Sequence, residues 1–153
     1  MGHHVVTLIP WRRLSDRTKR VLASAASEAV RAQSNEISPD HVLLGFLECD
    51  GAPARVLRAL GVDLTKARTA LGFVGTEMSS SERHMRPSAE TTRLVAHAAE
   101  EMPDQESRVE PEHLLLALAR DPGSASGLLE RLGITGEDIR AKLLKTDKDH
   151  ETG

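Results

Sequence analysis

Along most of the chain, hydrophobic residues recur every three or four positions, which is the spacing of amphipathic helices. The segment from Pro39 to the Asp50-Gly51 pair is apolar on almost every side, which predicts a central, buried helix. Short polar or glycine-containing segments separate the periodic stretches and supply helix starts and stops. In the first half of the chain, this pattern predicts helices over about 16–33, 39–49, 52–60 and 64–71.

The second half of the chain repeats the first. Residues 37–47 (ISPDHVLLGFL) correspond to residues 109–119 (VEPEHLLLALA) at an offset of 72. Upstream the offset is 73, which pairs Ser15 with Ser88, so the loop between the first and second helices differs by one residue between the copies. A repeat of this length is a complete structural unit, and helices are therefore expected again over about 88–102, 111–120, 124–132 and 135–144.

We therefore expect an all-α domain over residues 11–144, built from eight short helices as two four-helix repeats that are related by a pseudo-twofold axis and pack face to face. Gly61 and Gly133 should end the third helix of each repeat in a left-handed turn. The expected boundaries are an N-terminal extension (1–10), repeat one (14–71), a polar linker without strands (72–87), repeat two (88–144) and a charged, disordered tail (145–153).

The composition of the chain indicates which partners it can bind and in which cellular compartment it functions. The 153 residues carry a net charge of −3, without the basic excess that binding to nucleic-acid phosphates requires. The single cysteine, Cys49, excludes an internal disulfide, and no apolar run has the form of a signal peptide or a membrane span. We expect a cytoplasmic protein that is a monomer when isolated and binds neither nucleic acid nor membranes.

Motifs for catalysis and cofactor binding are missing from the sequence. It contains no Gly-Lys pair, which excludes a P-loop and ATP hydrolysis by this chain. His41 and His113 occupy the same position in each copy, in a first helical turn where a side chain commonly hydrogen-bonds the adjacent backbone. Cys49 is interpreted as an inert residue at a helix end. We expect no catalytic residue, no metal and no cofactor; the alternative is a small helical enzyme that uses both histidines.

The repeated motifs resemble the N-terminal domain of Clp-type AAA+ unfoldases, in particular the ClpC branch. The similarity covers Trp11 to Leu144 and is carried by a helical start (LSDRTKRVL, 14–22), an acid-His pair before a leucine-rich helix (DHVLLG, 40–45; EHLLLA, 112–117) and a Leu-x-x-Leu-Gly-Val/Ile motif at the end of the third helix. The resemblance implies a domain that lies on a hexameric ATPase, binds clients and adaptor proteins, and passes clients to the motor. The ATPase modules would follow Lys145.

The resemblance also implies one phosphoarginine site in each repeat, where the acid of the acid-His pair holds the guanidinium. Asp40 and Glu112 stand at these positions. A carboxylate can form two hydrogen bonds to a guanidinium, and helix N–H groups can donate to phosphate. Many relatives have Gly-Thr before the acid, whereas this chain has Ser38-Pro39 and Glu110-Pro111, so a hydroxyl and a backbone donor expected beside the phosphate are missing.

Other residues near these acids affect the expected site. Asp40 is one methylene shorter than the usual glutamate, and Glu110 adds a negative charge near the second site. Arg13, together with Arg12 and Arg17, would supply cations near the first copy if the N-terminal arm folds back. An alternative explanation of both acids is that they favour a helix start through the helix dipole.

The leading interpretation is a non-enzymatic protein- or peptide-binding module of the Clp proteolytic system. Its ligands would be clients, adaptors or small peptide ligands, including phosphoarginine and the cyclic peptides that target some actinobacterial ClpC domains. A free-standing copy would act as an adaptor or decoy. The alternative is an N-terminal fragment of a full-length ClpC-like, ATP-dependent unfoldase.

Overall fold

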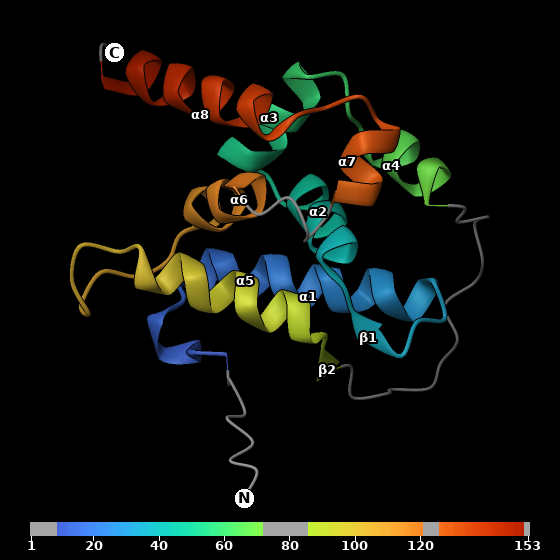
Figure 1. The fold of residues 1–153 in the computed structure, drawn as a ribbon, viewed down its shortest axis with the longest axis horizontal. Helices are drawn as coiled ribbons and strands as arrows, with labels where there is room; N and C mark the ends of the chain where they lie inside the picture. Colours follow the sequence, from blue (N-terminus) through green and yellow to red (C-terminus); the bar gives the residue numbers. More distant parts are fainter. Residues whose placement is uncertain (1–8, 72–85, 121–125, 152–153) are drawn as a thin grey trace, which may run out of the picture.

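The computed structural model describes residues 9–71, 86–120 and 126–151 (Figure 1). The described chain is mostly helical, as predicted. In chain order, its elements are η1 (Trp11–Arg13), α1 (Asp16–Arg31), β1 (Glu36–Ile37), α2 (Pro39–Glu48), α3 (Ala52–Ala59), α4 (Leu64–Ala70), β2 (Arg86–Pro87), α5 (Ala89–Glu100), α6 (Pro111–Arg120), α7 (Ser126–Arg131) and α8 (Gly136–Glu151).

Helices α2 and α6 form the centre of the domain. Helix α2 packs against α1 of its own repeat and α5 of the other, and α6 packs in the same way against α5 and α1. At the periphery, α3 contacts α8 and α4 contacts α7, and both of these contacts also join the two repeats (Figure 1). This reciprocal packing confirms the prediction of an all-α domain made of two four-helix repeats.

Two short extended segments also join the repeats, which the sequence analysis did not predict. Strands β1 and β2 pair in parallel, with Glu36 opposite Arg86 and Ile37 opposite Pro87, and Leu14 forms an isolated parallel bridge with Val109. Arg86 and Pro87 are the end of the predicted linker, whose residues 72–85 lie outside the described residues. Two residues are too few to show the alternation that identifies a strand in a sequence.

The helix boundaries of repeat one lie within about two residues of the prediction, and both predicted left-handed glycines are present, with φ of +90° at Gly61 and +72° at Gly133. Repeat two differs at two helix ends. Helix α5 ends at Glu100, before the predicted Met102, because Pro103 stands where repeat one has Val30 and proline cannot continue a helix interior.

The last helix, α8, is longer than predicted. It continues to Glu151, whereas the sequence analysis placed a disordered tail from residue 145. Between Leu144 and Glu151 the sequence contains neither proline nor glycine, so nothing in this segment stops the helix. The expectation of a disordered tail is therefore wrong for residues 145–151, because charged residues such as lysine and glutamate are compatible with a helix.

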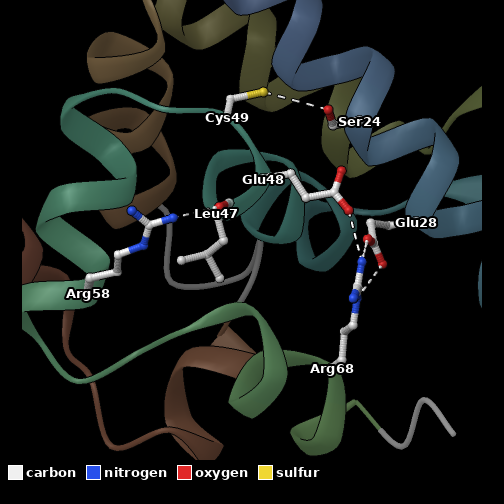
Figure 2. Close-up of polar contacts among 7 residues, drawn as sticks. All are labelled: Ser24, Glu28, Leu47, Glu48, Cys49, Arg58 and Arg68. Carbon is white, nitrogen blue, oxygen red and sulfur yellow. Dashed lines mark hydrogen bonds and ion pairs between the residues drawn. The ribbon is translucent and has the colours of Figure 1, made fainter. Parts of the chain in front are cut away.

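An ion-pair cluster fixes the helices of repeat one to each other (Figure 2). Arg68 of α4 donates hydrogen bonds to both carboxylate oxygens of Glu28 in α1, and its Nη2 also donates to Glu48 Oε1 of α2 at 2.9 Å. The Glu28 side chain has no solvent exposure. Burial by itself would raise the pKa of Glu28, but the bonds from Arg68 outweigh it and the pKa is lowered. Glu28 therefore stays charged inside the domain.

Candidate functional site

Each repeat starts its second helix with the same hydrogen bond from a backbone N–H to a histidine ring. Ser38 caps α2: its Oγ accepts from the His41 backbone N–H at 3.4 Å, and its own N–H donates to His41 Nδ1 at 2.9 Å. In repeat two, the Glu110 N–H donates to His113 Nδ1, also at 2.9 Å. In both repeats, the histidine of the acid-His pair accepts a hydrogen bond from the backbone at the helix start, as the sequence predicted.

The environment of His41 supports this capping role. Since Nδ1 accepts a hydrogen bond, the neutral ring carries its proton on Nε2. Burial lowers the pKa of His41, and the negative charge of Glu28 opposes this effect only in part. The ring is thus kept in the neutral form that can accept the bond from Ser38.

In repeat one, the candidate acid Asp40 lies in the first turn of α2 and is half-buried. Its Oδ1 is buried and accepts no hydrogen bond. Burial raises the pKa of Asp40, and the positive charge of Arg131 opposes this shift. Arg131 belongs to α7 of repeat two and reaches across to donate from Nη1 to the Ala70 carbonyl at 2.9 Å. The cation near Asp40 therefore comes from the protein itself.

In repeat two, the candidate acid Glu112 lies in the first turn of α6 and lines a cavity of about 290 Å³. The cavity lies between α1, the turn from α2 to α3, and the start of α6. Two arginines of α1 and the carboxylate of Asp50 also line it, together with apolar and small residues. The full lining is Arg17, Arg20, Val21, Phe46, Cys49, Asp50, Gly51, Pro53, Pro111 and Glu112.

Of the other candidate ligand-binding residues, Ser38 and Arg13 use their side chains in hydrogen bonds within the domain, and Glu110 does not. The Ser38 hydroxyl is used in the α2 cap. Arg13 donates to the carbonyl oxygens of Asp104 at 2.8 Å and Ser107 at 3.3 Å, and it lines a separate cavity of about 460 Å³ rather than the cavity of Glu112. Glu110 lies at the start of α6, two residues before Glu112, and its Oε2 is buried without a hydrogen-bond partner.

The arginines around Trp11 lie near the second copy, not near the first as the sequence analysis expected. Arg17 lines the Glu112 cavity, the Arg12 carbonyl accepts from Arg108 Nη1 at 2.8 Å, and Arg13 bonds the loop after α5. The reason is that α1 packs against α6 of the other repeat as well as against α2. Arg20 was not predicted as a site residue, although its spacing of three from Arg17 places both on one helix face.

Cys49 ends α2 and lines the same cavity. It is half-buried, and its Sγ lies 3.6 Å from the Ser24 hydroxyl of α1 (Figure 2). Within residues 9–71, 86–120 and 126–151, no group of three or more His, Cys, Asp and Glu side chains is arranged to hold a metal ion. None of the helices in the described part of the chain is long and apolar enough to cross a membrane.

Comparison with known proteins identifies the family. The family described as "Clp repeat (R) N-terminal domain" matches residues 13–107. The chain is 32% identical over 146 residues to the negative regulator of genetic competence ClpC/MecB of Bacillus subtilis and 31% identical over 138 residues to the chaperone protein ClpB of Oceanobacillus iheyensis. These alignments cover 92% and 87% of this chain but only 18% and 17% of the relatives, so the chain spans less than a fifth of their length.

Solved structures agree with this assignment. The N-terminal domain of the caseinolytic protease-associated chaperone ClpD from Arabidopsis thaliana matches with a TM-score of 0.72 and 26% identity, over 89% of this chain and 98% of that one. The Hsp104 N-terminal domain from Candida albicans shares the fold, with a TM-score of 0.66 and 17% identity over 88% of this chain and 91% of that one. This chain therefore belongs to the Clp repeat N-terminal domain family.

Proposed function

We propose that this domain is a non-enzymatic binding module that receives client or adaptor proteins of a Clp unfoldase through the Glu112 cavity. The observation that carries the proposal is the composition of that cavity: two carboxylates, those of Glu112 and Asp50, and two guanidinium groups line a single hollow of about 290 Å³. A hollow of this size fits one amino-acid side chain of a protein partner. Its charges favour a side chain that carries a cation and an anion together.

Phosphorylated arginine is the side chain that matches these charges. Its guanidinium can pair with Glu112, and its phosphate can pair with Arg17 and Arg20. Pro111 at the first position of α6 has no N–H for the phosphate, which is the departure noted in the sequence. The two arginines of α1 supply positive charge from a neighbouring helix instead. Phosphoarginine on a client protein is therefore the ligand that we propose.

Fluorescence anisotropy of a labelled peptide tests this function. A short peptide with one phosphoarginine is titrated with the protein, and the same peptide with unmodified arginine is the control. We expect saturable binding of the phosphorylated peptide, and at least tenfold weaker binding of the control, since it lacks the group that pairs with Arg17 and Arg20.

A pair of variants links the binding to the cavity. Glu112→Gln removes the carboxylate and keeps the shape of the side chain, and it should weaken binding about tenfold or more. Glu130→Gln changes an exposed glutamate of α7 that does not line the cavity and should leave binding unchanged. Equal affinities for the two peptides, or a Glu112→Gln protein that binds like wild type, would contradict the proposal.

The module would act within a larger unfoldase or as a separate adaptor or decoy. The relatives support the first arrangement, since the chain corresponds to less than a fifth of ClpC/MecB and ClpB. In that arrangement the ATP-driven activity belongs to modules that follow the domain, and a cytoplasmic location is part of the same proposal. The coding sequence after codon 153 separates the two: an in-frame P-loop supports the unfoldase, and a stop codon supports the adaptor or decoy.

A further inference from the structure

One guanidinium joins helix α4 to two carboxylates on two other helices. Nη2 of Arg68 donates to a carboxylate oxygen of Glu28 in α1 and, at 2.9 Å, to Oε1 of Glu48 in α2 (Figure 2). Of the seven residues of α4, only Ala67 is buried, and α7 adds one hydrogen bond to the carbonyl of Ala70. The shared guanidinium is therefore a main attachment of α4 to the rest of repeat one.

The two carboxylates of this cluster lie close enough to affect each other's protonation. Both accept a hydrogen bond from the same nitrogen of Arg68, so two negative charges there repel each other strongly. The Glu28 side chain has no solvent exposure, and that of Glu48 is only 23% exposed, so water screens this repulsion poorly. Such a pair binds its first proton at a higher pH than a lone carboxylate does.

The pH range of this proton lies near neutrality. Burial raises the pKa of Glu48, and the hydrogen bond with Glu28 and the Glu28 charge raise it further, to about 7, although the charges of Arg68 and Arg31 oppose the shift. Between pH 6 and pH 8, the pair therefore changes from one negative charge to two.

Other charged groups on the helices around α2 do not replace this effect. His41 of α2 itself responds to the Glu28 charge, but burial lowers its pKa, so the ring is mostly neutral in this range. Arg58 of α3 donates to the Leu47 carbonyl at 3.3 Å rather than to a carboxylate. The charged residues of α5, which also packs against α2, are all exposed: Glu90, Arg93, His97 and Glu100.

Repeat two does not have the acid pair. The positions that correspond to Glu28, Glu48 and Arg68 at the offsets of 73 and 72 are Glu101, Arg120 and Arg140. Glu101 pairs with Arg120 at 2.9 Å, and both side chains are nearly half exposed. The fold thus accepts a base where repeat one has an acid, and α8 provides an internal comparison for α4.

From this arrangement we propose that α4 is a proton-controlled latch, which opens away from α1 and α2 more readily when the acid pair has bound its proton. Opening removes Arg68, whereas Glu28 and Glu48 stay side by side because α1 and α2 remain packed. Two adjacent carboxylates hold a proton more tightly without a cation than with one. Water that enters on opening favours the charged forms, but it replaces direct bonds from the guanidinium. Opening therefore takes up a proton, and a lower pH favours it.

Unfolding of the whole domain has the opposite pH dependence. It separates Glu28 from Glu48 and returns Glu48 to an ordinary pKa, so complete unfolding releases a proton in this range. Opening of α4 alone keeps the two carboxylates together and binds a proton. The sign of the pH dependence thus distinguishes the local motion from complete unfolding.

Hydrogen–deuterium exchange measured by mass spectrometry on the folded protein tests the latch. Exchange of the amides in α4 (Leu64–Ala70) is compared at pH 6 and pH 8, after correction for the intrinsic exchange rate at each pH. Since opening takes up a proton, the protection factor of α4 should be about fivefold lower at pH 6 than at pH 8. Residues 136–144 of α8, where no acid pair is present, should change less than about twofold.

The variant Glu48→Gln links the effect to the acid pair. Glutamine is neutral at both pH values, so α4 of this variant should show the same low protection at pH 6 and at pH 8. Glu130→Gln changes an exposed glutamate of α7 and should keep the wild-type difference. Circular dichroism verifies that both variants are folded.

The outcomes decide the proposal in either direction. A wild-type α4 that is equally protected at both pH values, or better protected at pH 6, would overturn it. A Glu48→Gln protein that keeps the wild-type difference would also overturn it. Lower protection of α4 at pH 6 that disappears in Glu48→Gln and persists in Glu130→Gln supports the latch.

Discussion

The Thr18 hydroxyl of repeat one donates a hydrogen bond of 2.7 Å to the Val109 carbonyl of repeat two. The equivalent bond runs from repeat two to repeat one, where the Thr91 hydroxyl donates to the Ile37 carbonyl at 2.8 Å. The backbone N–H of Ser15 also donates to Val109, at 3.1 Å. Each repeat thus starts its first helix on the extended segment of the other, so that neither repeat has all its hydrogen-bond partners alone.

Replacing Thr18 with valine tests this connection. Valine has the same shape but no hydroxyl, and it leaves the buried Val109 carbonyl with only the Ser15 N–H as a donor. We expect the free energy of unfolding to fall by about 1–2 kcal/mol. Thr91→Val should cost a similar amount, because the bond it removes is the symmetric one. Urea denaturation followed by circular dichroism gives both values.

The control for the threonine variants is Thr69→Val. The Thr69 hydroxyl also donates to a backbone carbonyl, that of Thr65 at 2.8 Å, but the pair lies on the exposed surface of α4 where water can replace the bond. The change should stay within about 0.5 kcal/mol. Equal effects at positions 18 and 69 would show that the bonds between repeats contribute nothing beyond an ordinary exposed hydrogen bond.

Arg68→Met should destabilise the domain strongly. It removes the donors that compensate Glu28, a carboxylate with no solvent exposure. We expect the free energy of unfolding to fall by about 3 kcal/mol. Without Arg68, Glu28 either keeps an unpaired charge in the interior or has to bind a proton. The control is Arg120→Met in repeat two, which breaks an exposed pair with Glu101 and should cost less than about 1 kcal/mol. Thermal unfolding measures the stability of both variants. If both lost the same amount of stability, the burial of Glu28 would not be the reason for the importance of Arg68.

Much of the fold could be predicted because its signals are local. Ser15, Ser38, Asp63 and Ser88 cap α1, α2, α4 and α5, and serine and aspartate are residue types that mark a helix start in a sequence. The repeat then specified the order of helices in the second half. The strand pairing could not be predicted, since two-residue strands have no pattern of their own and form only when the two repeats meet. The end of α8 does not follow from charge, because the charged residues after Leu144 include no proline or glycine that would stop the helix.

The site was predictable in its residue types but not in its surroundings. The position of His41 and His113 in a first helical turn indicated backbone bonding, and the structure has these bonds. Which acid has a cavity could not be inferred, since Arg17 and Arg20 reach Glu112 only through the packing of α1 across the repeat boundary. The contribution of Arg131 beside Asp40 depends on the same long-range arrangement.

Glu48 should make stability depend on pH near neutrality. Burial, hydrogen bonding with Glu28 and the Glu28 charge together raise the pKa of Glu48 to about 7, from an ordinary value of 4.5. A carboxyl with a raised pKa in the folded state stabilises the fold below pH 4.5, and this contribution is lost as the pH rises through about 7. Between pH 5 and pH 8, the loss should be on the order of 1 kcal/mol, since solvent screens this half-exposed group.

The variant Glu48→Gln isolates this effect. Burial lowers the pKa of His41 from 6.5, so that group gives stability the opposite pH dependence, and only the difference between wild type and variant reports on Glu48. As the pH rises from 5 to 8, the urea midpoint of the variant should increase relative to that of wild type. A difference that stays constant over this range would mean that Glu48 titrates normally.

Gly45→Ala should destabilise the domain, although alanine is the better helix former. Gly45 lies in α2 where that helix crosses α1, and an added Cβ would collide with the Val21 carbonyl and lie 3.1 Å from the Ala25 nitrogen. The gain in helix propensity is about 1 kcal/mol, whereas overpacking against rigid backbone costs more. A net loss of roughly 1–2 kcal/mol is expected.

The reverse change at the matching position provides the comparison for Gly45→Ala. Repeat two has Ala117 at this place, so α5 and α6 already accommodate the methyl group that α1 and α2 exclude. Ala117→Gly should lose about 1 kcal/mol through helix propensity alone. Glycine at position 45 and alanine at position 117 would then each give the more stable domain. Thermal unfolding of the two variants measures this directly. If Gly45→Ala instead raised the melting temperature, the close crossing of α1 and α2 at this residue would be refuted.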